Sequence, residues 1–309
     1  MKALVKTSGQ ATTLAFMDVP RPEAGEDELL VRIRAIGVGI HDEYFHAQDI
    51  RYPYVIGIEA AGIVEEVGAN VTGYRAGDRI AFISMMQPKG GTWAEYAVIS
   101  KNSLILPVPD TMTFEQAAAF PVVGNTVLKA LIGAGLHAGE TLFVAGGAGA
   151  LGSMLIQLAV ASGYTVVASA SKQNHEFMKS LGATQVVDYH DPDWQAQVRT
   201  MYPAGVDAAI AIHPGTPAGV QPVVKDGGVL VAVSGDTVAT ERGIVLKGVY
   251  NDIDVSRELA DLLAQVADGR ITQTISNAYA FADALSALNQ VQTRHTRGKL
   301  VLSVPDSEH

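Results

Sequence analysis

Short stretches in which apolar and polar residues alternate dominate the first third of the chain. The alternation is clearest over residues 29–38 and 61–68, and residues 69–79 carry the Gly, Asn and Asp that favour turns. A period of two residues indicates strands that bury one face. The pattern predicts a compact, barrel-like β domain over residues 1–110.

The middle of the chain changes to apolar runs separated by helix-like segments. The runs lie at residues 141–146, 165–171, 185–189, 207–212, 228–235 and 243–250. The helix-like segments cover 113–135, with interruptions at Pro121 and Gly124, then 151–163 and 173–183. Because uninterrupted apolar runs are typical of strands covered on both faces, this region predicts a parallel sheet of βαβ units. An amphipathic helix at 256–269 and a strand at 299–304 follow.

Length and composition fit two globular domains. The 309 residues are 48% hydrophobic and 17% charged, enough to build large cores. The net charge is −10 and no basic run occurs, so we expect no nucleic-acid partner and no anionic membrane partner. The polar N-terminus and the interrupted apolar stretch 117–136 predict neither a signal peptide nor a membrane span, so we expect a cytoplasmic protein. Cysteine is absent, which excludes disulfides, thiolate nucleophiles and Cys-ligated zinc.

A glycine-rich turn joins the first apolar run to a helix. Gly146, Gly149 and Gly152 are spaced three residues apart. Glycine permits a tight turn and the close approach of a diphosphate, whose charge a helix N-terminus stabilises. The spacing alone also fits a purely structural turn, but the βαβ context favours dinucleotide binding. The amides of Ala150 and Leu151 would complete this site.

The second apolar run ends without a carboxylate. Residues 168–172 read Ala-Ser-Ala-Ser-Lys, where an NAD site has an Asp or Glu for the ribose 2′-hydroxyl. Hydroxyls and an ammonium would instead accept a 2′-phosphate. We therefore predict NADP(H) as the cofactor, with Ser171 and Lys172 as contacts. A solvated lysine at a helix start is the alternative for Lys172.

Motifs along the whole chain carry a resemblance to a known superfamily. Gly-Ile-Glu-Ala-Ala-Gly at 57–62 is followed by Gly-Gly-Thr-Trp-Ala-Glu-Tyr at 90–96, by the segment 120–131 and by Arg-Gly-Lys-Leu-Val-Leu at 297–302. In order and spacing, the chain resembles the medium-chain dehydrogenase/reductase superfamily and, within it, the zinc-independent quinone oxidoreductase branch.

The resemblance implies an α/β protein of two domains. Residues 1–117 and 257–309 would form a GroES-like β-rich catalytic domain, and residues 118–256 a Rossmann NADP(H)-binding domain with a doubly wound parallel sheet. The cofactor would lie in the cleft between them.

Three positions decide whether the catalytic zinc of some superfamily members is expected. Aligned by motif, the zinc ligands of those members fall on Gly39, Ile58 and near Val122. None of these residues has a side-chain lone pair, so we expect no metal. Glu59 matches the glutamate beside the family's ligand histidine, and without a metal we expect it to be a buried hydrogen-bond acceptor.

The missing metal narrows the expected chemistry. Hydride transfer to a simple ketone normally needs an electrophile such as zinc. A conjugated acceptor spreads the incoming charge itself, so we predict NADPH-dependent reduction of a quinone or another conjugated carbonyl. Donors to its oxygen are offered by the segment Asp42-Glu43-Tyr44 and by the Tyr52/Tyr54 pair. Tyr44 and Tyr52 are the candidate catalytic residues, and packing is the alternative role for each.

The resemblance also implies cofactor contacts outside the glycine turn. Asn125 and Thr126 lie on the helical segment that passes the nicotinamide in the family, with helix capping as the alternative. Tyr189 matches a tyrosine near the adenosine end, and Ser234 and Gly235 follow a strand whose end would face the cofactor. The eight histidines have no ligand-like spacing.

Two other functions stay open. An enone or enoyl reductase of the same superfamily would share these motifs, and so would an NADPH-binding protein with little turnover. The missing ligands disfavour a zinc alcohol dehydrogenase. The strand at 243–250 would form an apolar sheet edge, which family members pair across a two-fold axis, so we expect a homodimer.

Overall fold

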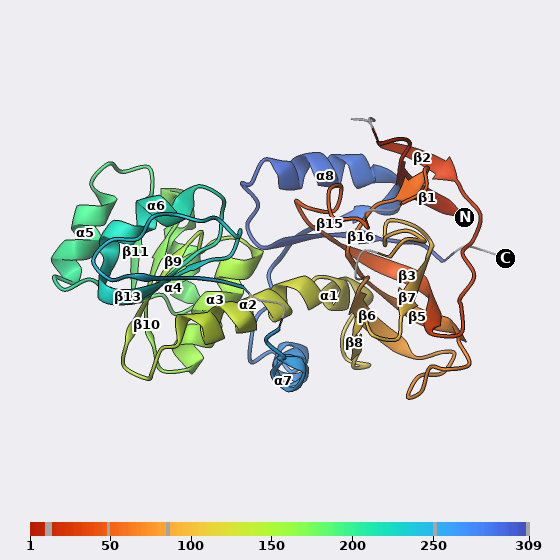
Figure 1. Ribbon diagram of the computed structural model, residues 1–309, viewed down its shortest axis with the longest axis horizontal. Helices are drawn as coiled ribbons and strands as arrows, with labels where there is room; N and C mark the ends of the chain where they lie inside the picture. The colour runs from red at the N-terminus through yellow and green to blue at the C-terminus, as the bar shows by residue number, and fades with distance from the viewer. Residues whose placement is uncertain (10–13, 48–49, 85–86, 250–251, 307–309) are drawn as a thin grey trace. The chain divides into compact units, whose positions relative to one another are not determined.

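The computed structural model describes residues 1–9, 14–47, 50–84, 87–249 and 252–306. The chain divides into two compact units (Figure 1). Unit 1 comprises residues 1–122 and 275–309, and unit 2 comprises residues 123–274. Unit 1 is rich in antiparallel strands and unit 2 has a parallel sheet with helices, so the predicted α/β class is confirmed.

Unit 1 is built from two sheets. Its strands are β1 Lys2–Lys6, β2 Leu14–Asp18, β3 Glu28–Val38, β4 Tyr54–Val55, β5 Glu59–Val67, β6 Arg79–Ile83, β7 Tyr96–Ser100, β8 Leu104–Pro107, β15 Ile275–Ala280 and β16 Lys299–Ser303. Within the described residues, the small sheet has the order β2-β1-β4 and the large one β15-β16-β3-β5-β6-β8, with β7 also on β3. β16 pairs antiparallel with β3, so the C-terminal segment completes this unit.

The predicted alternation produces the core of unit 1. β3 and β5 pair antiparallel, and their inward residues Ile33 and Val64 are buried together with Phe82 and Trp93. Among its described residues, this unit contains α1 Phe114–Ala118, the 3₁₀ turn η3 Phe281–Asp283 and α8 Ala284–Gln292. A capping box closes the start of α1: the Thr113 hydroxyl accepts the Gln116 N–H, and the Gln116 side chain accepts the Thr113 N–H.

Unit 2 contains the predicted parallel sheet. Its strands are β9 Thr141–Ala145, β10 Thr165–Ser169, β11 Gln185–Val187, β12 Val206–Ala211, β13 Val224–Ala232 and β14 Val245–Gly248. Their order among the described residues is β11-β10-β9-β12-β13-β14, and each neighbouring pair is parallel. This is the Rossmann order, in which the direction of winding reverses beside the first strand, here between β9 and β12. Ligands bind such sheets at the carboxyl ends of the strands, at this reversal.

Helices and short 3₁₀ turns precede, connect and follow these strands. They are α2 Pro121–Ala134, α3 Ala150–Ala161, η1 Lys172–Asn174, α4 His175–Ser180, α5 Trp194–Met201, α6 Thr216–Val220, η2 Gln221–Val223 and α7 Ser256–Ala267. Pro121 is the first residue of α2, where its fixed φ fits a helix, so the predicted break there is confirmed. The break expected at Gly124 is wrong: Gly124 lies inside α2, where burial of neighbouring valines offsets the roughly 1 kcal/mol that glycine costs.

The units divide at 122/123 and 274/275, where the sequence indicated 117/118 and 256/257. The difference at the second boundary has a physical cause in Gln157 on α3. Its Nε2 donates to the Thr272 carbonyl at 2.9 Å, and its Oε1 accepts the Thr272 N–H at 2.8 Å. These two hydrogen bonds attach the segment after α7 to α3, and so to unit 2.

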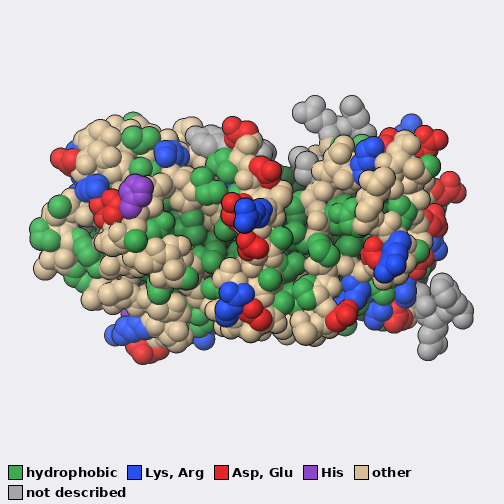
Figure 2. Space-filling model, turned by 90° about the horizontal axis from the view of Figure 1, so that it is seen from below, with side chains coloured by type: hydrophobic (Ala, Val, Ile, Leu, Met, Phe, Trp, Pro, Cys, Tyr) green, Lys and Arg blue, Asp and Glu red, His purple; other side chains and the backbone are tan. Residues whose placement is uncertain are grey.

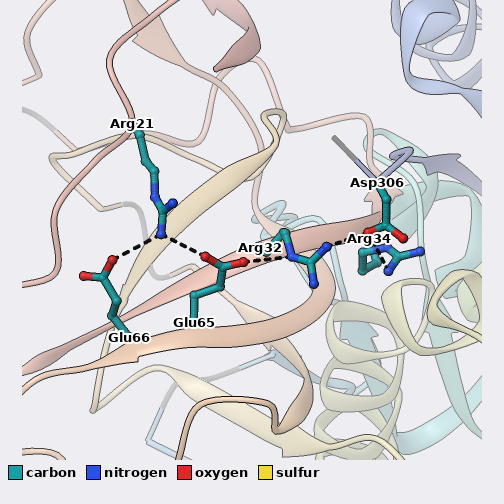
Figure 3. A network of polar contacts seen from close by, with 6 residues as sticks. All are labelled: Arg21, Arg32, Arg34, Glu65, Glu66 and Asp306. Carbon is teal, nitrogen blue, oxygen red and sulfur yellow. Dashed lines mark hydrogen bonds and ion pairs between the residues drawn. The ribbon is translucent and has the colours of Figure 1, made fainter. Parts of the chain in front are cut away.

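Ion pairs across strands stabilise the surface of unit 1. Figure 3 shows one network, in which Glu65 lies between Arg21 and Arg32, at 2.9 and 2.8 Å. Arg32 and Arg34 both reach Asp306, at 2.6 and 2.8 Å, which fastens the segment after β16 to β3. Figure 2 shows the same intermingling of acidic and basic side chains on one face of the molecule. Every helix within the described residues is too short or too polar to cross a membrane.

Candidate functional site

The glycine-rich turn lies at the carboxyl end of β9, where the winding of the sheet reverses. Gly146 has a φ of +91°, a conformation that favours glycine. The N–H groups of Gly146 and Gly147 donate to the Ser169 carbonyl at 3.2 and 2.9 Å, which ties the turn to the end of β10. A Cβ at Gly146 would lie 3.0 Å from the His213 ring, which follows β12. The turn is thus enclosed by the ends of both neighbouring strands.

The glycines of the turn are required for different reasons. A Cβ at Gly152 would lie 2.2 Å from the Gly146 carbonyl oxygen, and a Cβ at Gly147 would lie 2.6 Å from the Met178 sulfur. Packing therefore demands these two glycines. At Gly149 a Cβ would meet only the Gly146 oxygen, at 3.8 Å, within the described residues. Its lack of a side chain leaves space that the protein itself does not fill.

The start of α3 offers hydrogen-bond donors beside this space. Gly149 is the N-cap of α3, and its own N–H makes only a long bond of 3.4 Å to the Gly146 carbonyl. The first N–H groups of a helix, here those of Ala150, Leu151 and Gly152, have no acceptor within the helix. The first turn of α3 carries no acidic residue. The geometry therefore fits an anionic group such as a diphosphate.

The end of β10 carries the two residues predicted to contact a 2′-phosphate. Ser171 is the N-cap of η1, and its Oγ accepts a hydrogen bond from the Asn174 side chain at 3.1 Å. The Ser171 hydroxyl therefore keeps its proton for another acceptor. Lys172 is exposed beside it. Both residues lie at the carboxyl end of the parallel sheet, as the glycine turn does.

The neighbouring strand β11 brings Asp188 and His190, which the sequence did not single out, to the end of β10. Ser169 pairs with Val187, so Asp188 and Tyr189 stand beside the end of β10. Asp188 accepts the N–H and the Nδ1 of His190, both at 3.0 Å, and these bonds lower the pKa of Asp188. Tyr189 is 45% exposed and its ring lies 4.1 Å from that of His190. The sequence contains a sign of these groups, because the polar segment Asp-Tyr-His directly follows a predicted strand.

The remaining candidates of unit 2 occupy α2 and the end of β13. Asn125 and Thr126 are the fifth and sixth residues of α2, so they cannot cap it. Both are half-buried, and neither side chain bonds to a residue that the structure describes. Ser234 donates to Asp236 at 3.0 Å, and Asp236 accepts the Gly215 N–H. Asp236 thus joins the loops that follow β12 and β13, with the Ser234 hydroxyl bonded to it and Gly235 between them.

In unit 1, Glu59 is an internal acceptor, as expected. Its side chain is 2% exposed, and its Oε2 accepts the Val122 N–H at 2.8 Å. Its Oε1 lies 2.5 Å from the ammonium of Lys299, whose side chain is 8% exposed. Lys299 carries no signal in the sequence, because only the pairing of β16 with β3 brings it near β5.

The three tyrosines near the start of unit 1 differ in their surroundings. Tyr44 is 61% exposed and Tyr52 is 39% exposed. Tyr54 is buried, and its hydroxyl donates to the Gln87 carbonyl at 2.8 Å. Burial raises the pKa of Tyr54 to about 12. Tyr54 is therefore a packing residue, whereas Tyr44 and Tyr52 are exposed at the surface of unit 1.

The chain matches two protein families. Residues 25–110 match the alcohol dehydrogenase GroES-like domain and residues 181–302 match the zinc-binding dehydrogenase family, together well over half of the chain. The chain belongs to the medium-chain dehydrogenase/reductase superfamily. The first match lies within unit 1 and confirms the predicted GroES-like domain of this medium-chain dehydrogenase/reductase.

Known proteins resemble this medium-chain dehydrogenase/reductase over different lengths. The solved structure of the quinone oxidoreductase from Coxiella burnetii is 29% identical, with a TM-score of 0.89 over 99% of both chains. The NADPH-dependent alkenal/one oxidoreductase of Arabidopsis thaliana chloroplasts is 29% identical over 302 residues, 91% of this chain and 73% of that protein. Dehydrogenase azaJ of Aspergillus niger is 32% identical over 215 residues, 63% of this chain. That match spans 62% of the relative, less than two thirds of its length.

The name of the second family raises the question of zinc. Gly39, Ile58 and Val122 supply no side-chain ligand, and the Val122 N–H is bonded to Glu59. Glu59 itself is bonded to Lys299, whose ammonium would repel a cation. The described residues contain no group of three or more His, Asp or Glu placed to hold a metal ion. The residues at these positions do not fit a catalytic zinc.

Proposed function

We propose that this medium-chain dehydrogenase/reductase uses NADPH to reduce a quinone or another conjugated carbonyl compound without a catalytic metal. The observation that carries the proposal is the open space over Gly149 at the start of α3. This space lies at the carboxyl ends of the strands, where the winding of the sheet reverses. Packing does not require glycine there, whereas the approach of a diphosphate does.

The cofactor contacts follow from this anchor. The amides of Ala150, Leu151 and Gly152 would bind the diphosphate, because a helix start offers unpaired N–H groups. Ser171 and Lys172 would bind the 2′-phosphate through a hydroxyl and an ammonium.

Further side chains would hold the two ends of the cofactor. Tyr189 would contact the adenosine end, and Asn125 and Thr126 the carboxamide or ribose of the nicotinamide end. Ser234 and Gly235 would line the strand ends between them. The bound cofactor supplies a hydride, and these residues fix where it is delivered.

The acceptor chemistry follows from the side chains at the zinc positions. Gly39, Ile58 and Val122 offer nothing to polarise a carbonyl. A conjugated acceptor needs less help, since its own π-system spreads the charge. The hydroxyls of Tyr44 and Tyr52 would donate hydrogen bonds to the acceptor oxygen, and water would protonate the product. The names of the Coxiella and Arabidopsis relatives support this class of acceptor.

NADPH oxidation with a panel of acceptors tests the proposal. The panel contains a quinone, an α,β-unsaturated ketone and the saturated ketone of the same carbon skeleton, each with and without a zinc chelator. We expect the conjugated acceptors to react at least about a hundredfold faster than the saturated ketone, with no effect of the chelator. NADPH binding without turnover of any acceptor would replace the proposal by an NADPH-binding role. Faster reduction of the saturated ketone would overturn it.

We also propose a homodimer that forms through β14. This strand is the last of its sheet, and Val245 at its start is 48% exposed. An apolar edge strand left open would promote aggregation, and pairing with a second copy removes the edge. Light scattering at micromolar concentration is expected to give twice the chain mass for the wild type and the single mass for Val245→Asp. A monomeric wild type would refute the dimer.

A further inference from the structure

Asp42 is buried at the centre of the turn that carries Tyr44. The residue is only 2% exposed, although Tyr44 two positions later is 61% exposed. Its Oδ2 accepts two hydrogen bonds, from the Gly39 N–H at 2.8 Å and from the Trp93 indole N–H at 3.1 Å. Its backbone carbonyl accepts the Gly57 N–H at 3.1 Å. Asp42 therefore closes the turn onto Gly39 and joins it to the segments that carry Gly57 and Trp93.

The segment that follows depends on this anchor. The N–H groups of Tyr44 and Phe45 both donate to the His41 carbonyl at 2.9 Å, which forms a compact turn directly around Asp42. Trp93 is fully buried, and a Cβ at Gly57 would lie 2.1 Å from its ring. The partners of Asp42 are thus buried and closely packed, so the Asp42 side chain fastens the turn that carries Tyr44 to the interior of unit 1.

The charges that face Asp42 are unbalanced. Lys299 on β16 lowers its pKa and Glu59 on β5 raises it, but burial is the largest cause and raises the pKa of Asp42 to about 7. The neighbouring His41 has its own pKa lowered, first by burial and then by the Arg294 guanidinium. One buried ammonium therefore serves two buried carboxyl groups, and Asp42 is the one without a direct ion pair to it.

We propose that Asp42 is a positioning residue for the acceptor: through Gly39, Gly57 and Trp93 it fixes the turn that presents Tyr44 to the quinone or enone. This inference rests on the proposed function, because it takes Tyr44 as an acceptor contact. It predicts that the charge state of Asp42 alters acceptor binding and leaves cofactor binding unchanged.

Trp93 provides a direct reporter of Asp42. The chain has two tryptophans, so Trp194→Phe leaves Trp93 as the only one. Its fluorescence is measured between about pH 5 and 9, and we expect one transition near neutral pH. Asp42→Asn in the same background keeps a hydrogen-bond acceptor but cannot ionise, and we expect it to abolish the transition. A signal that is flat in the parent, or that titrates identically in both proteins, would overturn the inference.

Kinetics then test the positioning role. Asp42→Asn is expected to show, at every pH, the acceptor KM that the wild type shows near pH 6, with kcat changed less than about twofold. Asp42→Leu removes the acceptor atoms and is expected to raise this KM about tenfold. The Kd of NADPH stays unchanged in both variants. Equal effects on the Kd of NADPH and on the acceptor KM, or parallel pH profiles for the wild type and Asp42→Asn, would indicate a merely structural residue.

Different experiments test the role of Asp42 and the proposed function. If no quinone or enone is reduced, the proposed function is wrong and Asp42 loses its acceptor role. The Trp93 titration needs no substrate, so it still decides whether Asp42 ionises beside Trp93.

Discussion

Lys299 on β16 forms a buried ion pair with Glu59 on β5, across 240 positions of sequence. The same carboxylate accepts the Val122 N–H at the start of α2. The pair therefore connects the last strand of the chain, a central strand of unit 1 and the first turn of a helix. It occupies a position next to Ile58, where zinc-dependent members of the superfamily have a metal ligand.

Removing the ammonium is expected to destabilise the protein strongly. Lys299→Met keeps the apolar stem but leaves Glu59 buried without a counter-charge, which costs about 3–5 kcal/mol. Urea unfolding followed by circular dichroism measures the loss. The matched control is Lys2→Met, since Lys2 pairs with Asp18 at the surface, where both side chains are more than half exposed. We expect no measurable change there, and equal losses in both variants would contradict the role of burial.

The space over Gly149 can be tested by filling it. Gly149→Ala places a Cβ where the protein has room, so we expect a loss of less than about 1 kcal/mol in stability. Because the methyl group would obstruct a diphosphate, the Kd of NADPH measured by calorimetry is expected to rise at least about tenfold. Gly219→Ala on α6 is the control, since nothing described lies within 4 Å of its Cβ and no ligand is proposed there. An unchanged Kd in Gly149→Ala would refute the diphosphate site.

Cofactor preference depends on Lys172 in our proposal. Lys172→Ala is expected to weaken NADPH binding about tenfold and to leave NADH binding unchanged, because only NADPH carries the 2′-phosphate. Lys179→Ala on α4 removes another exposed lysine, one that pairs with Glu176, and serves as the control. If the ratio of the two affinities is the same in Lys172→Ala and the wild type, this lysine does not discriminate between the cofactors.

The raised pKa of Asp42 is expected to make the stability of the protein depend on pH. Its pKa is raised from 3.8 to about 7 by burial, so the folded protein binds a proton that the unfolded chain releases between these values. Its contribution to stability is therefore greatest below about pH 4, falls as the pH rises to about 7 and is then constant. The fall is on the order of 4 kcal/mol. Asp207 has the opposite sign: its pKa is lowered despite burial, by bonds to Lys225 and Thr141.

The difference between wild type and Asp42→Asn isolates this effect. The introduced amide cannot ionise, so the free energy of unfolding of the variant does not decrease through Asp42 between about pH 4 and 7. The variant is therefore expected to be more stable than the wild type at pH 8. Guanidinium unfolding of both proteins at pH 5 and 8 gives the comparison. A constant difference at the two pH values would show that Asp42 does not titrate in this range.

Local physical rules made much of unit 2 predictable. The strand from Thr141 and the turn at Gly146 depend on steric demands that act within a few residues. The parallel order of the sheet followed from uninterrupted apolar runs, because strands covered on both faces need no polar positions. Helix α5 was missed because it is only eight residues long and mostly polar, so its three large apolar residues Trp194, Val198 and Met201 gave too short a pattern.

The sequence by itself determined the superfamily, the glycine turn and the absence of side-chain ligands at the zinc positions. Only the tertiary structure decided that Lys299 neutralises Glu59, that Asp42 is anchored by Trp93 and that Asp188 stands beside the end of β10. The physical reason is that these contacts depend on which strands pair and in what register. Strand pairing joins residues far apart in the chain, and no local pattern of side chains records it.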